Sequence, residues 1–343
     1  MKNKLKQYLN KLRVEMSMKH KLDGWHIKWL RKEINDIEQK IKNKKMKKAI
    51  VTGGAGFIGS YLVDQLINIG VEVTILDNLS TGKKENINPK AKFIECDIST
   101  TSYIDLTFYL NHIDTVFHLA AKTAVQESIE NPTIYNNINV NGTLKLLEAA
   151  AAMKVNRFVF SSSSSVYGDA KIPTAEQHKL NPISPYALNK LIGEQYCKLY
   201  SEIYNLDTVC LRYFNVYGDK MNNEGGYKLV FPIFKQQLLN SKPLTITNDG
   251  NQRRDFVYVA DVVNANILAA THKEQLSGDV FNIGNGTNYS VNEVADMMGG
   301  EKTYGEKRIE PYETLADNKK ASKILGWNPK GCLKSWIKDY MSI

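Results

Sequence analysis

The sequence of 343 residues predicts an α/β protein with a doubly wound parallel sheet and a smaller C-terminal lobe. Short apolar runs alternate with longer segments of helical periodicity from about residue 48 to residue 211, which is typical of parallel strands covered by helices on both faces. Beyond residue 211 this rhythm weakens. Gly, Asn and Pro gather at 218–226 and 242–250, where a smaller lobe would be built.

The first elements follow one another closely along the chain. An apolar run at 49–52 predicts a buried strand, 57–69 predicts a helix that is closed by Gly70, and 72–76 predicts a second strand that ends at Asp77. Further strands are expected at 92–95, 115–119 and 157–161, with helical segments such as 139–152 between them. We therefore divide the chain into an N-terminal extension (1–47), a sheet domain (48–215) and a lobe (216–343), some segments of which return to the sheet.

The formal net charge of +9 is confined to the N-terminal extension. Residues 1–47 contain fifteen Lys or Arg against five Asp or Glu, whereas the other 30 basic and 31 acidic residues nearly cancel. The body of the protein therefore lacks the basic excess typical of nucleic-acid binding, and no nucleic acid is expected.

With no run of 18 apolar residues and no signal-peptide pattern, a cytoplasmic protein without integral membrane association is expected. The four cysteines lack metal-site spacing, so no metal is expected.

The basic extension is expected to be helical and amphipathic. Apolar residues recur at intervals of roughly three to four residues among lysines, namely Trp25, Ile27 with Trp29 and Leu30, Ile34, Ile37 and Ile41. A solvated or loosely docked helix is one interpretation, and contact with an anionic membrane surface, an acidic partner or another subunit are the others. Residues 46–51 also read like the natural beginning of the sheet domain, so the segment before them could be a late addition or a start-site artefact.

A glycine-rich loop joins the first predicted strand to the first predicted helix. Gly54, Gly56 and Gly59 have the spacing G-x-G-x-x-G. The first permits a tight turn, the second lets the backbone approach a pyrophosphate, and the third allows the helix and strand to pack closely. The phosphates would meet the N-terminus of the helix, where unpaired N–H groups point outward. Residues 48–215 are therefore expected to form a Rossmann-type domain that binds a dinucleotide.

Asp77 indicates which dinucleotide is bound, because it ends the second strand 21 residues after Gly56. A carboxylate there accepts hydrogen bonds from ribose hydroxyls and repels a 2′-phosphate, so NAD is expected rather than NADP. Asp97, after the third strand, is a candidate for the adenine side of the site. The residues expected to contact NAD are Gly53, Gly56, Phe57, Ile58, Gly59, Asp77, Asn78, Asp97, Ile98, Leu119, Ala120, Ala121, Tyr186 and Lys190.

Tyr186 and Lys190 are four residues apart, a spacing that places both side chains on one face of a helix. There the ammonium favours the phenolate and brings the phenol pKa from near 10 towards neutrality. A tyrosine of this kind is suited to act as a base, and beside a dinucleotide it would remove a proton while a hydride is transferred.

Six motifs follow one another from about residue 47 to the C-terminus. They are TGGAGFIG at 52–59, HLAA at 118–121, SSSSSVYG at 161–168, SPYALNK at 184–190, RYFNVYG at 212–218 and RDFVYV at 254–259. Together they resemble the extended short-chain dehydrogenase/reductase family, and within it the chain is most similar to the nucleotide-sugar epimerases, in particular UDP-glucose and UDP-N-acetylglucosamine 4-epimerases. The resemblance implies a UDP-sugar substrate and a homodimer formed through a helix bundle.

The resemblance also implies roles for three residues. Tyr186 would be the general base and acid, and Lys190 would lower its pKa and bind the nicotinamide ribose. Ser163, four residues before Tyr167, takes the position of the hydroxyl that hydrogen-bonds the reacting sugar, with Ser162 as the second candidate. Removal of the proton from the sugar 4-hydroxyl and of the 4-hydride leaves a 4-keto sugar, and return of the hydride to its other face inverts C4.

Differences between this chain and the related enzymes near the serine run favour epimerisation over dehydration and decarboxylation. The similar 4,6-dehydratases carry an Asp-Glu pair after the catalytic Thr, and the similar UDP-glucuronate decarboxylases carry a Glu shortly before the Val-Tyr-Gly, whereas this chain has Ser164 and Ser165. Elimination of water or of carbon dioxide thereby loses its usual proton carrier. The alternatives are another enzyme of the family, namely a UDP-glucuronate epimerase or decarboxylase or a 4,6-dehydratase, and a non-catalytic NAD-binding sensor or scaffold.

On the substrate side, Asn215, Arg254 and Arg308 match positions that contact the nucleotide diphosphate in the family. Thr314 aligns with a position where a small residue admits N-acetyl groups, which favours a UDP-N-acetylhexosamine or tolerance of both sugar types.

His118 is expected to be a packed residue at a strand end rather than a base. Thr123 stands where the galactose-type epimerases often carry a lysine over the cofactor.

Overall fold

The computed structural model describes residues 2–17, 27, 30–34, 46–221, 230–305 and 311–342. The chain forms two compact units, Met1–Met46 and Lys47–Ile343. The first contains helix α1 (Lys2–Ser17), in which Leu12 is buried, and Leu30 of this unit is also buried. The amphipathic pattern of the extension also involves Trp25, Trp29, Ile37 and Ile41, which lie outside the described residues.

The second unit is built on a seven-stranded sheet in which every pairing is parallel, in the order β10-β6-β5-β4-β1-β2-β3. The α/β class and the doubly wound parallel sheet are thereby confirmed. The chain runs outward from β1 to the edge at β3 and then returns to place β4 on the other side of β1. The carboxyl ends of β1 and β4 therefore form the switch point at which open sheets of this kind bind ligands. The strands are β1 (Lys48–Thr52), β2 (Glu72–Asp77), β3 (Lys92–Glu95), β4 (Thr115–His118), β5 (Arg157–Ser163), β6 (Thr208–Tyr213) and β10 (Asp279–Ile283).

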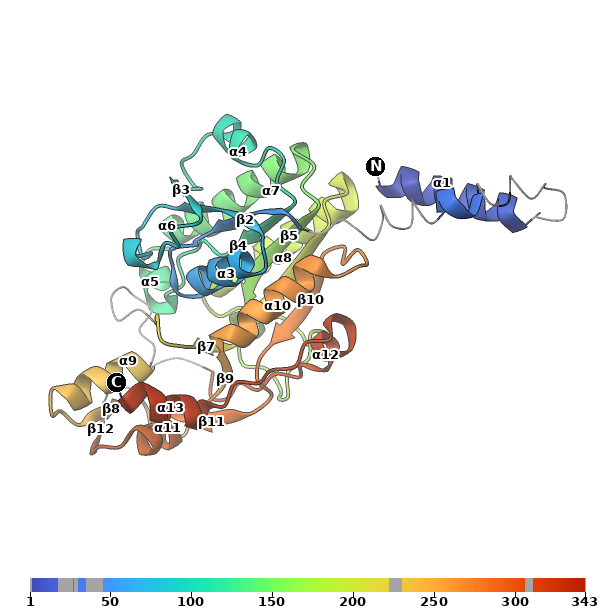
Figure 1. Ribbon diagram of the computed structural model, residues 1–343. Coiled ribbons are helices and arrows are strands. Elements are labelled where there is room, and N and C mark those ends of the chain that lie inside the picture. Colours follow the sequence, from blue (N-terminus) through green and yellow to red (C-terminus); the bar gives the residue numbers. More distant parts are fainter. Residues whose placement is uncertain are drawn as a thin grey trace. The chain divides into compact units, whose positions relative to one another are not determined.

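Helices cover both faces of this sheet (Figure 1). Helices α3 (Phe57–Asn68) and α10 (Val259–Thr271) pack together on one face, and α4 (Tyr103–Tyr109), α7 (Gly142–Ala152) and α8 (Pro185–Tyr204) follow one another on the other. Two short helices, α5 (Val125–Glu130) and α6 (Pro132–Asn136), and a π-helical turn (Asn137–Asn141) lead into α7.

The predicted elements are present, with shifted ends. The helix expected at 139–152 begins instead with the π-helical turn. The strand expected to end at residue 161 continues to Ser163, because Ser162 and Ser163 pair with Arg212 and Tyr213 of β6. This extension carries the serine run along the buried sheet before the chain turns away.

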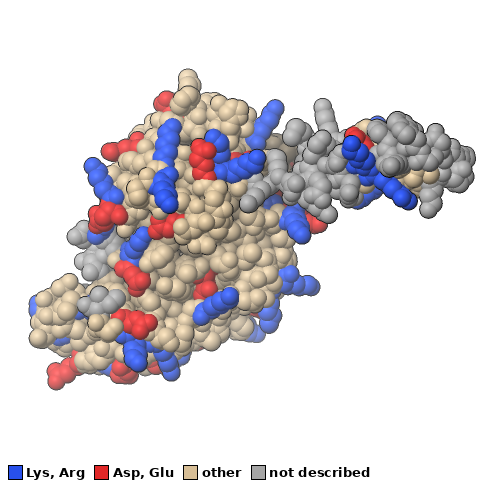
Figure 2. Space-filling model, viewed as in Figure 1, with Lys and Arg blue, Asp and Glu red and all other residues tan. Residues whose placement is uncertain are grey.

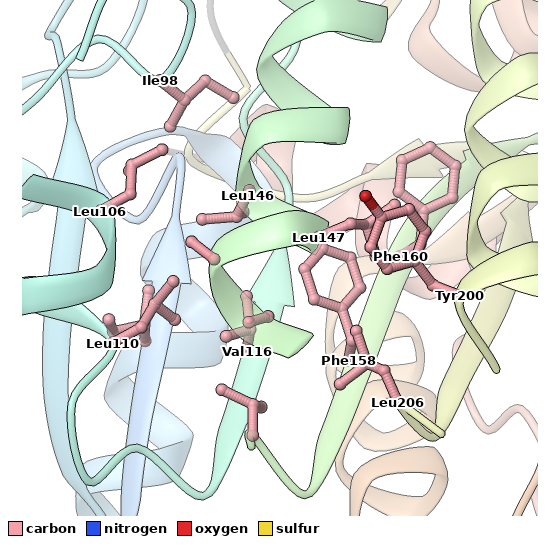
Figure 3. Close-up of a cluster of buried hydrophobic side chains, with 14 of the residues drawn as sticks. Ile98, Leu106, Leu110, Val116, Leu146, Leu147, Phe158, Phe160, Tyr200 and Leu206 are labelled. Atoms are coloured by element: carbon pink, nitrogen blue, oxygen red, sulfur yellow. The ribbon is translucent and has the colours of Figure 1, made fainter. Parts of the chain in front are cut away.

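The core beneath α4, α7 and α8 is apolar and densely filled. Figure 3 shows Leu147 of α7 beside Phe158 and Phe160 of β5, with Leu106 and Leu110 from the α4 region at the other side of the same cluster. These side chains are at most 1% exposed. Burial of apolar surface at about 25 cal/mol per Å² makes such a cluster the main stabilising contribution on this face.

The C-terminal part forms two smaller sheets with their own apolar core, which includes Tyr217, Phe231, Phe256 and Trp336. The prediction that residues after 215 mainly hold the substrate stays a prediction, although β10 lies at the edge of the large sheet. The remaining elements are β7 (Asn215–Tyr217), β8 (Leu244–Ile246), β9 (Arg253–Tyr258), β11 (Asn288–Ser290), β12 (Lys302–Tyr304), α9 (Val230–Leu239), α11 (Val291–Met298), α12 (Lys319–Leu325) and α13 (Leu333–Ser342).

Charges of both signs are interspersed over the visible face of the second unit (Figure 2), as expected from its near-zero balance. Among the residues that the structure describes, no helix is both long enough and apolar enough to cross a bilayer.

A buried ion pair joins α8 to β6. Arg212 donates from Nε to Glu194 Oε1 at 2.8 Å and from Nη2 to Glu194 Oε2 at 2.6 Å, and both side chains are 3% exposed. Arg212 also donates to the hydroxyl of Tyr167 at 2.7 Å, and Glu194 accepts a hydrogen bond from Ser162. Every charge in this cluster is therefore matched, so removal of one partner would leave the other charged and buried.

Replacement of Glu194 by Ala should lower the free energy of unfolding by about 3–5 kcal/mol, since it leaves the Arg212 guanidinium uncompensated. The matched control is Glu202→Ala on the same helix, whose pair with Lys198 is 56–62% exposed at 4.0 Å and should change stability by at most about 0.5 kcal/mol. Urea denaturation of the two variants measures the difference. Equal losses would contradict the importance given to the buried pair.

Candidate active site

The loop after β1 has a shape that only glycine permits at two positions. Gly53 has φ +70°, and a Cβ there would lie 2.8 Å from the Ala120 backbone nitrogen. A Cβ at Gly59 would collide with the carbonyl oxygen of Gly53. Helix α3 begins at Phe57, and the residue before it, Gly56, has no capping side chain, so the first N–H groups of the helix face the loop unblocked by the chain's own polar side chains. A diphosphate fits this arrangement of open backbone and N–H groups.

Asp77, the predicted ribose acceptor, lies at the end of β2 and is 7% exposed. Its Oδ2 accepts from the N–H of Ala55 at 3.0 Å and its Oδ1 from the N–H of Leu79 at 2.8 Å. Each carboxylate oxygen keeps a second lone pair for a ribose hydroxyl. Burial raises the pKa of Asp77 above its usual value, which the two N–H donors counteract. Asp77 thus also braces the glycine loop, a role that the sequence did not indicate.

The other predicted cofactor residues gather at the same edge of the sheet. Asn78, after β2, donates to Asp97, after β3, at 2.9 Å. Leu119, Ala120 and Ala121 follow β4 directly across from Gly53, and all three are half-buried. The edge therefore presents backbone groups and two carboxylates around the switch point, and these residues fit NAD.

His118 lies beneath this edge, and its two ring nitrogens are both used. Nδ1 is 2.7 Å from the hydroxyl of Thr52, and Nε2 is 2.8 Å from the hydroxyl of Thr143, which itself donates to the Asn139 carbonyl at 2.6 Å. His118 is 1% exposed. Burial, aided by the charge of Lys190, lowers the pKa of His118 to about 3. His118 therefore stays neutral and orients its neighbours, in line with its prediction as a packed residue.

Tyr186 and Lys190 occupy one face of α8, as their spacing predicted. Helix α8 begins at Pro185, and the Ser184 side chain caps it by accepting from the N–H of Ala187 at 3.2 Å. Tyr186 is 9% exposed, and Lys190 is 5% exposed with Nζ 6.0 Å from the centre of the Tyr186 ring. Nζ also donates to the Ser161 carbonyl at 2.8 Å. Burial lowers the pKa of Lys190 to about 8.

Each serine at the end of β5 has a different partner. Ser161 Oγ is 3.0 Å from the hydroxyl of Tyr213, and the Ser162 hydroxyl donates to the carboxylate of Glu194. Ser163 is half-buried and caps the 3₁₀ turn Ser164–Tyr167. Because the Ser162 proton is already committed to a buried carboxylate, the structure favours Ser163 as the serine that remains available to a ligand.

An ionic cluster beside Tyr186 was not foreseen from the sequence. Tyr135 shares a buried cluster with Tyr186, and its hydroxyl donates to Glu127 Oε2 at 3.0 Å. Lys122 Nζ bonds Glu127 Oε1 at 2.5 Å, and this bond lowers the pKa of Glu127. The three residues come from the loop after β4, α5 and α6, and no spacing in the sequence marks them as neighbours of Tyr186.

Three of the predicted substrate residues meet at the three-stranded sheet β11-β9-β7. The Asn215 side chain donates to the Asp255 carbonyl at 3.2 Å, and the Thr314 hydroxyl accepts from the Asp255 N–H at 3.2 Å. Arg254 is the neighbour of Asp255, and its Nη1 donates to the Arg253 carbonyl at 2.8 Å. Arg308 lies outside the described residues.

The carboxylate of Asp255 organises this region. It is fully buried and accepts from the N–H groups of Asn285 at 2.6 Å, Gly286 at 2.9 Å and Ala316 at 3.0 Å. Burial raises the pKa of Asp255 to about 6. Among the described residues, no group of three His, Cys, Asp or Glu side chains could hold a metal ion.

Residues 49–284 match the sequence model of the NAD dependent epimerase/dehydratase family. A putative UDP-glucose 4-epimerase of Methanocaldococcus jannaschii is 43% identical over 298 residues, which are 84% of this chain and 95% of that protein. A solved structure of UDP-N-acetylglucosamine 4-epimerase from Methanobrevibacter ruminantium, in complex with UDP-N-acetylmuramic acid, matches with a TM-score of 0.81 and 35% identity, covering 87% of this chain and 98% of that one. UDP-glucuronic acid 4-epimerase from Bacillus cereus, in complex with UDP-glucuronic acid and NAD, matches with a TM-score of 0.80 and 34% identity, covering 86% and 99%.

Replacement of Gly59 by Ala should abolish measurable NAD binding, because the added Cβ displaces the Gly53 carbonyl and opens the loop. The matched control is Gly70→Ala, just after the other end of α3. Gly70 has φ +84° with nothing within 4 Å of an added Cβ, so this variant should lose about 1 kcal/mol of stability and keep its NAD affinity. Titration calorimetry with NAD separates the two, and wild-type affinity in Gly59→Ala would refute the assignment of the loop.

The stability of the Lys190 site should depend on pH in a defined direction. The pKa of Lys190 is about 8 in the fold against an ordinary 10.5, so the folded state binds fewer protons than the unfolded state between these values. The cost of burying the ammonium is fully present below pH 8 and is relieved as the pH rises to 10.5. The free energy of unfolding of the wild type should therefore rise relative to that of Lys190→Met across this interval.

Denaturant unfolding at pH 7.5 and at pH 10.5 measures this difference, and groups that titrate in both proteins cancel. The control is Lys198→Met, on the same helix with a side chain 62% exposed. Its replacement should change the free energy of unfolding by at most about 0.5 kcal/mol. A pH-independent difference for Lys190→Met would show that the ammonium is not desolvated.

Proposed function

The chain belongs to the NAD-dependent epimerase/dehydratase family, and on this premise we propose that it inverts C4 of a UDP-hexose, UDP-N-acetylglucosamine or UDP-glucose or both, through a 4-keto sugar. NAD is the cofactor. The observation that carries the proposal is the burial of Tyr186 and Lys190 on one helix face next to a serine run that contains no carboxylate.

The residues proposed to hold NAD are those of the sheet edge. The glycine loop and the first N–H groups of α3 suit the diphosphate, Asp77 the ribose hydroxyls, and Asn78 with Asp97 the adenine side. When bound, NAD supplies a hydride acceptor that returns the hydride to the same carbon.

The chain's own residues would handle the proton. Tyr186 as phenolate accepts the proton of the sugar 4-hydroxyl and gives it back when the hydride returns, so no net proton is consumed. Lys190 favours the phenolate by its positive charge, and its low exposure keeps that charge poorly screened by water. Ser163 holds the 4-oxygen by a hydrogen bond. These groups suffice for oxidation and re-reduction at one carbon.

Dehydration and decarboxylation need a further acid or base, and the residues around Tyr186 do not favour either. Ser164 and Ser165 carry hydroxyls where the resembling enzymes carry carboxylates. Glu127 comes near Tyr186 through Tyr135, but its bond to Lys122 lowers its pKa, so it stays ionised and is a poor proton donor. Epimerisation is therefore the reaction that the available groups support best.

The choice of sugar depends on the substrate region. Asn215, Arg254 and Thr314 lie around β9, which supports a nucleotide diphosphate and a nearby sugar. The relatives are named for glucose, N-acetylglucosamine and glucuronic acid. We propose that Thr314 admits an N-acetyl group, that the lobe after 215 mainly holds the substrate, and that the enzyme works as a cytoplasmic homodimer. An epimerase of UDP-glucuronate is the second candidate.

The test is incubation of the protein and NAD with UDP-glucose, UDP-N-acetylglucosamine, UDP-glucuronate and UDP-xylose, followed by analysis of the product sugars. Inversion at C4 of the N-acetylated sugar, with or without the glucose form, is expected. Inversion of only non-acetylated sugars would contradict the role of Thr314. A product lacking water or carbon dioxide would contradict the reaction.

Replacement of Tyr186 by Phe should lower kcat at least about 100-fold, because the base is lost while the ring remains. The matched control is Tyr204→Phe at the other end of the same helix. That side chain is 58% exposed and its change should leave kcat within about twofold. Undiminished turnover by Tyr186→Phe would contradict the proposed mechanism.

A further inference from the structure

The hydroxyl of Ser163 has both of its acceptor positions filled by one neighbour, Ser165. Its oxygen accepts from the Ser165 N–H at 3.2 Å, which caps the 3₁₀ turn, and from the Ser165 hydroxyl at 2.9 Å. A serine oxygen has two lone pairs and one proton. With both lone pairs engaged, what Ser163 can offer a ligand is its proton.

The described part of the chain contains no acceptor hydrogen-bonded to that Ser163 proton, whereas the serines before it are committed. Ser162 donates to Glu194, whose carboxylate is held by Arg212, and Ser161 is bonded to Tyr213. Because the buried ion pair holds Glu194 in place, Ser162 keeps its orientation and does not exchange roles with Ser163.

On the basis of the proposed function, we propose that Ser165 is a positioning residue that fixes Ser163 as a hydrogen-bond donor to the 4-oxygen of the sugar. In the oxidation step the sugar O–H bond breaks and a Tyr186 O–H bond forms, while the sugar C4–H bond breaks and its hydride would go to bound NAD, the oxidant of the proposed function. Ser163 keeps its own proton throughout and gives a hydrogen bond to the oxygen that becomes the ketone. Since Ser163 has no lone pair to spare, it does not compete with Tyr186 for the sugar proton.

The side chain at position 165 then determines whether Ser163 donates or accepts in its hydrogen bond to the sugar. A hydroxyl at 165 donates to Ser163, whereas a carboxylate there could only accept. An acceptor at 165 would draw the Ser163 proton away from the sugar and turn a lone pair towards it. Ser163 would then compete with Tyr186 instead of assisting it.

A double-mutant cycle tests whether Ser165 acts through Ser163. Ser165→Ala should lower kcat about fivefold with KM within about twofold, and Ser165→Thr, which keeps the hydroxyl, should restore kcat. Ser165→Asp should be slower than Ser165→Ala. In a Ser163→Ala background, Ser165→Ala should have no further effect, because the group it orients is gone.

The matched control is Ser164→Ala, since the Ser164 side chain is hydrogen-bonded to neither Ser163 nor Ser165 in this turn. Its kcat should stay within about twofold of the wild type. An equal loss from Ser165→Ala in the wild-type and Ser163→Ala backgrounds would overturn the proposal. A Ser165→Asp variant faster than Ser165→Ala would do the same.

Neutron diffraction of the deuterium-exchanged protein shows which of the two serines donates the hydrogen bond, and it requires no measurement of turnover. We expect the deuterium between the two oxygens to be bonded to Ser165 Oγ. A deuterium bonded to Ser163 Oγ and directed at Ser165 would overturn the proposal whatever reaction the enzyme performs. Absence of epimerisation in the wild type would instead overturn the proposed function, so the two failures are distinguishable.

Discussion

Arg212 of β6 and Glu194 of α8 face each other as two forks, both 3% exposed, and most of the candidate site depends on this contact. Glu194 lies one helical turn after Lys190 and two turns after Tyr186, so the pair fixes the rotation and height of α8 against the sheet. The same carboxylate takes the proton of Ser162, and the same guanidinium holds Tyr167 at the end of the 3₁₀ turn. A buried pair of this kind adds little net stability compared with apolar packing, but it tolerates only one arrangement of its neighbours.

His118 connects the sheet edge proposed to hold NAD to the arrangement that the Arg212–Glu194 pair fixes. Thr52 at the end of β1 and Thr143 of α7 bond its two nitrogens, and Thr52 also accepts from the Ala120 N–H at 3.2 Å. A neutral ring is needed here because a second cation would repel the buried ammonium of Lys190. The depressed pKa of His118 follows from its burial and from this same proximity. The loop after β4 thereby has a fixed position relative to both the glycine loop and α8.

Asp255 likewise holds several segments of the C-terminal part together by hydrogen bonds. Its carboxylate gathers the N–H groups of the loop at 285–286 and of Ala316, while its own backbone contacts Asn215 and Thr314. Three N–H donors offset part of the cost of burying the charge, which is why the pKa of Asp255 is raised only to about 6. Segments that are distant in the sequence meet at this one side chain, and the residues proposed to bind substrate lie around it.

The sequence by itself determined the strand, glycine loop and helix at 48–68 and the shared face of Tyr186 and Lys190, because both depend on periodicity and spacing between near neighbours. It also pointed to the serine run, but it could not choose firmly among five adjacent hydroxyls. That choice depends on Glu194, which lies 32 residues from Ser162, on Tyr213, which lies 52 residues from Ser161, and on the turn that folds Ser165 back onto Ser163. The position of Glu127 beside Tyr135 and the gathering of chain around Asp255 were likewise decided only by the tertiary structure. A hydrogen-bond partner is set by which elements pack together, and local sequence carries no record of that packing.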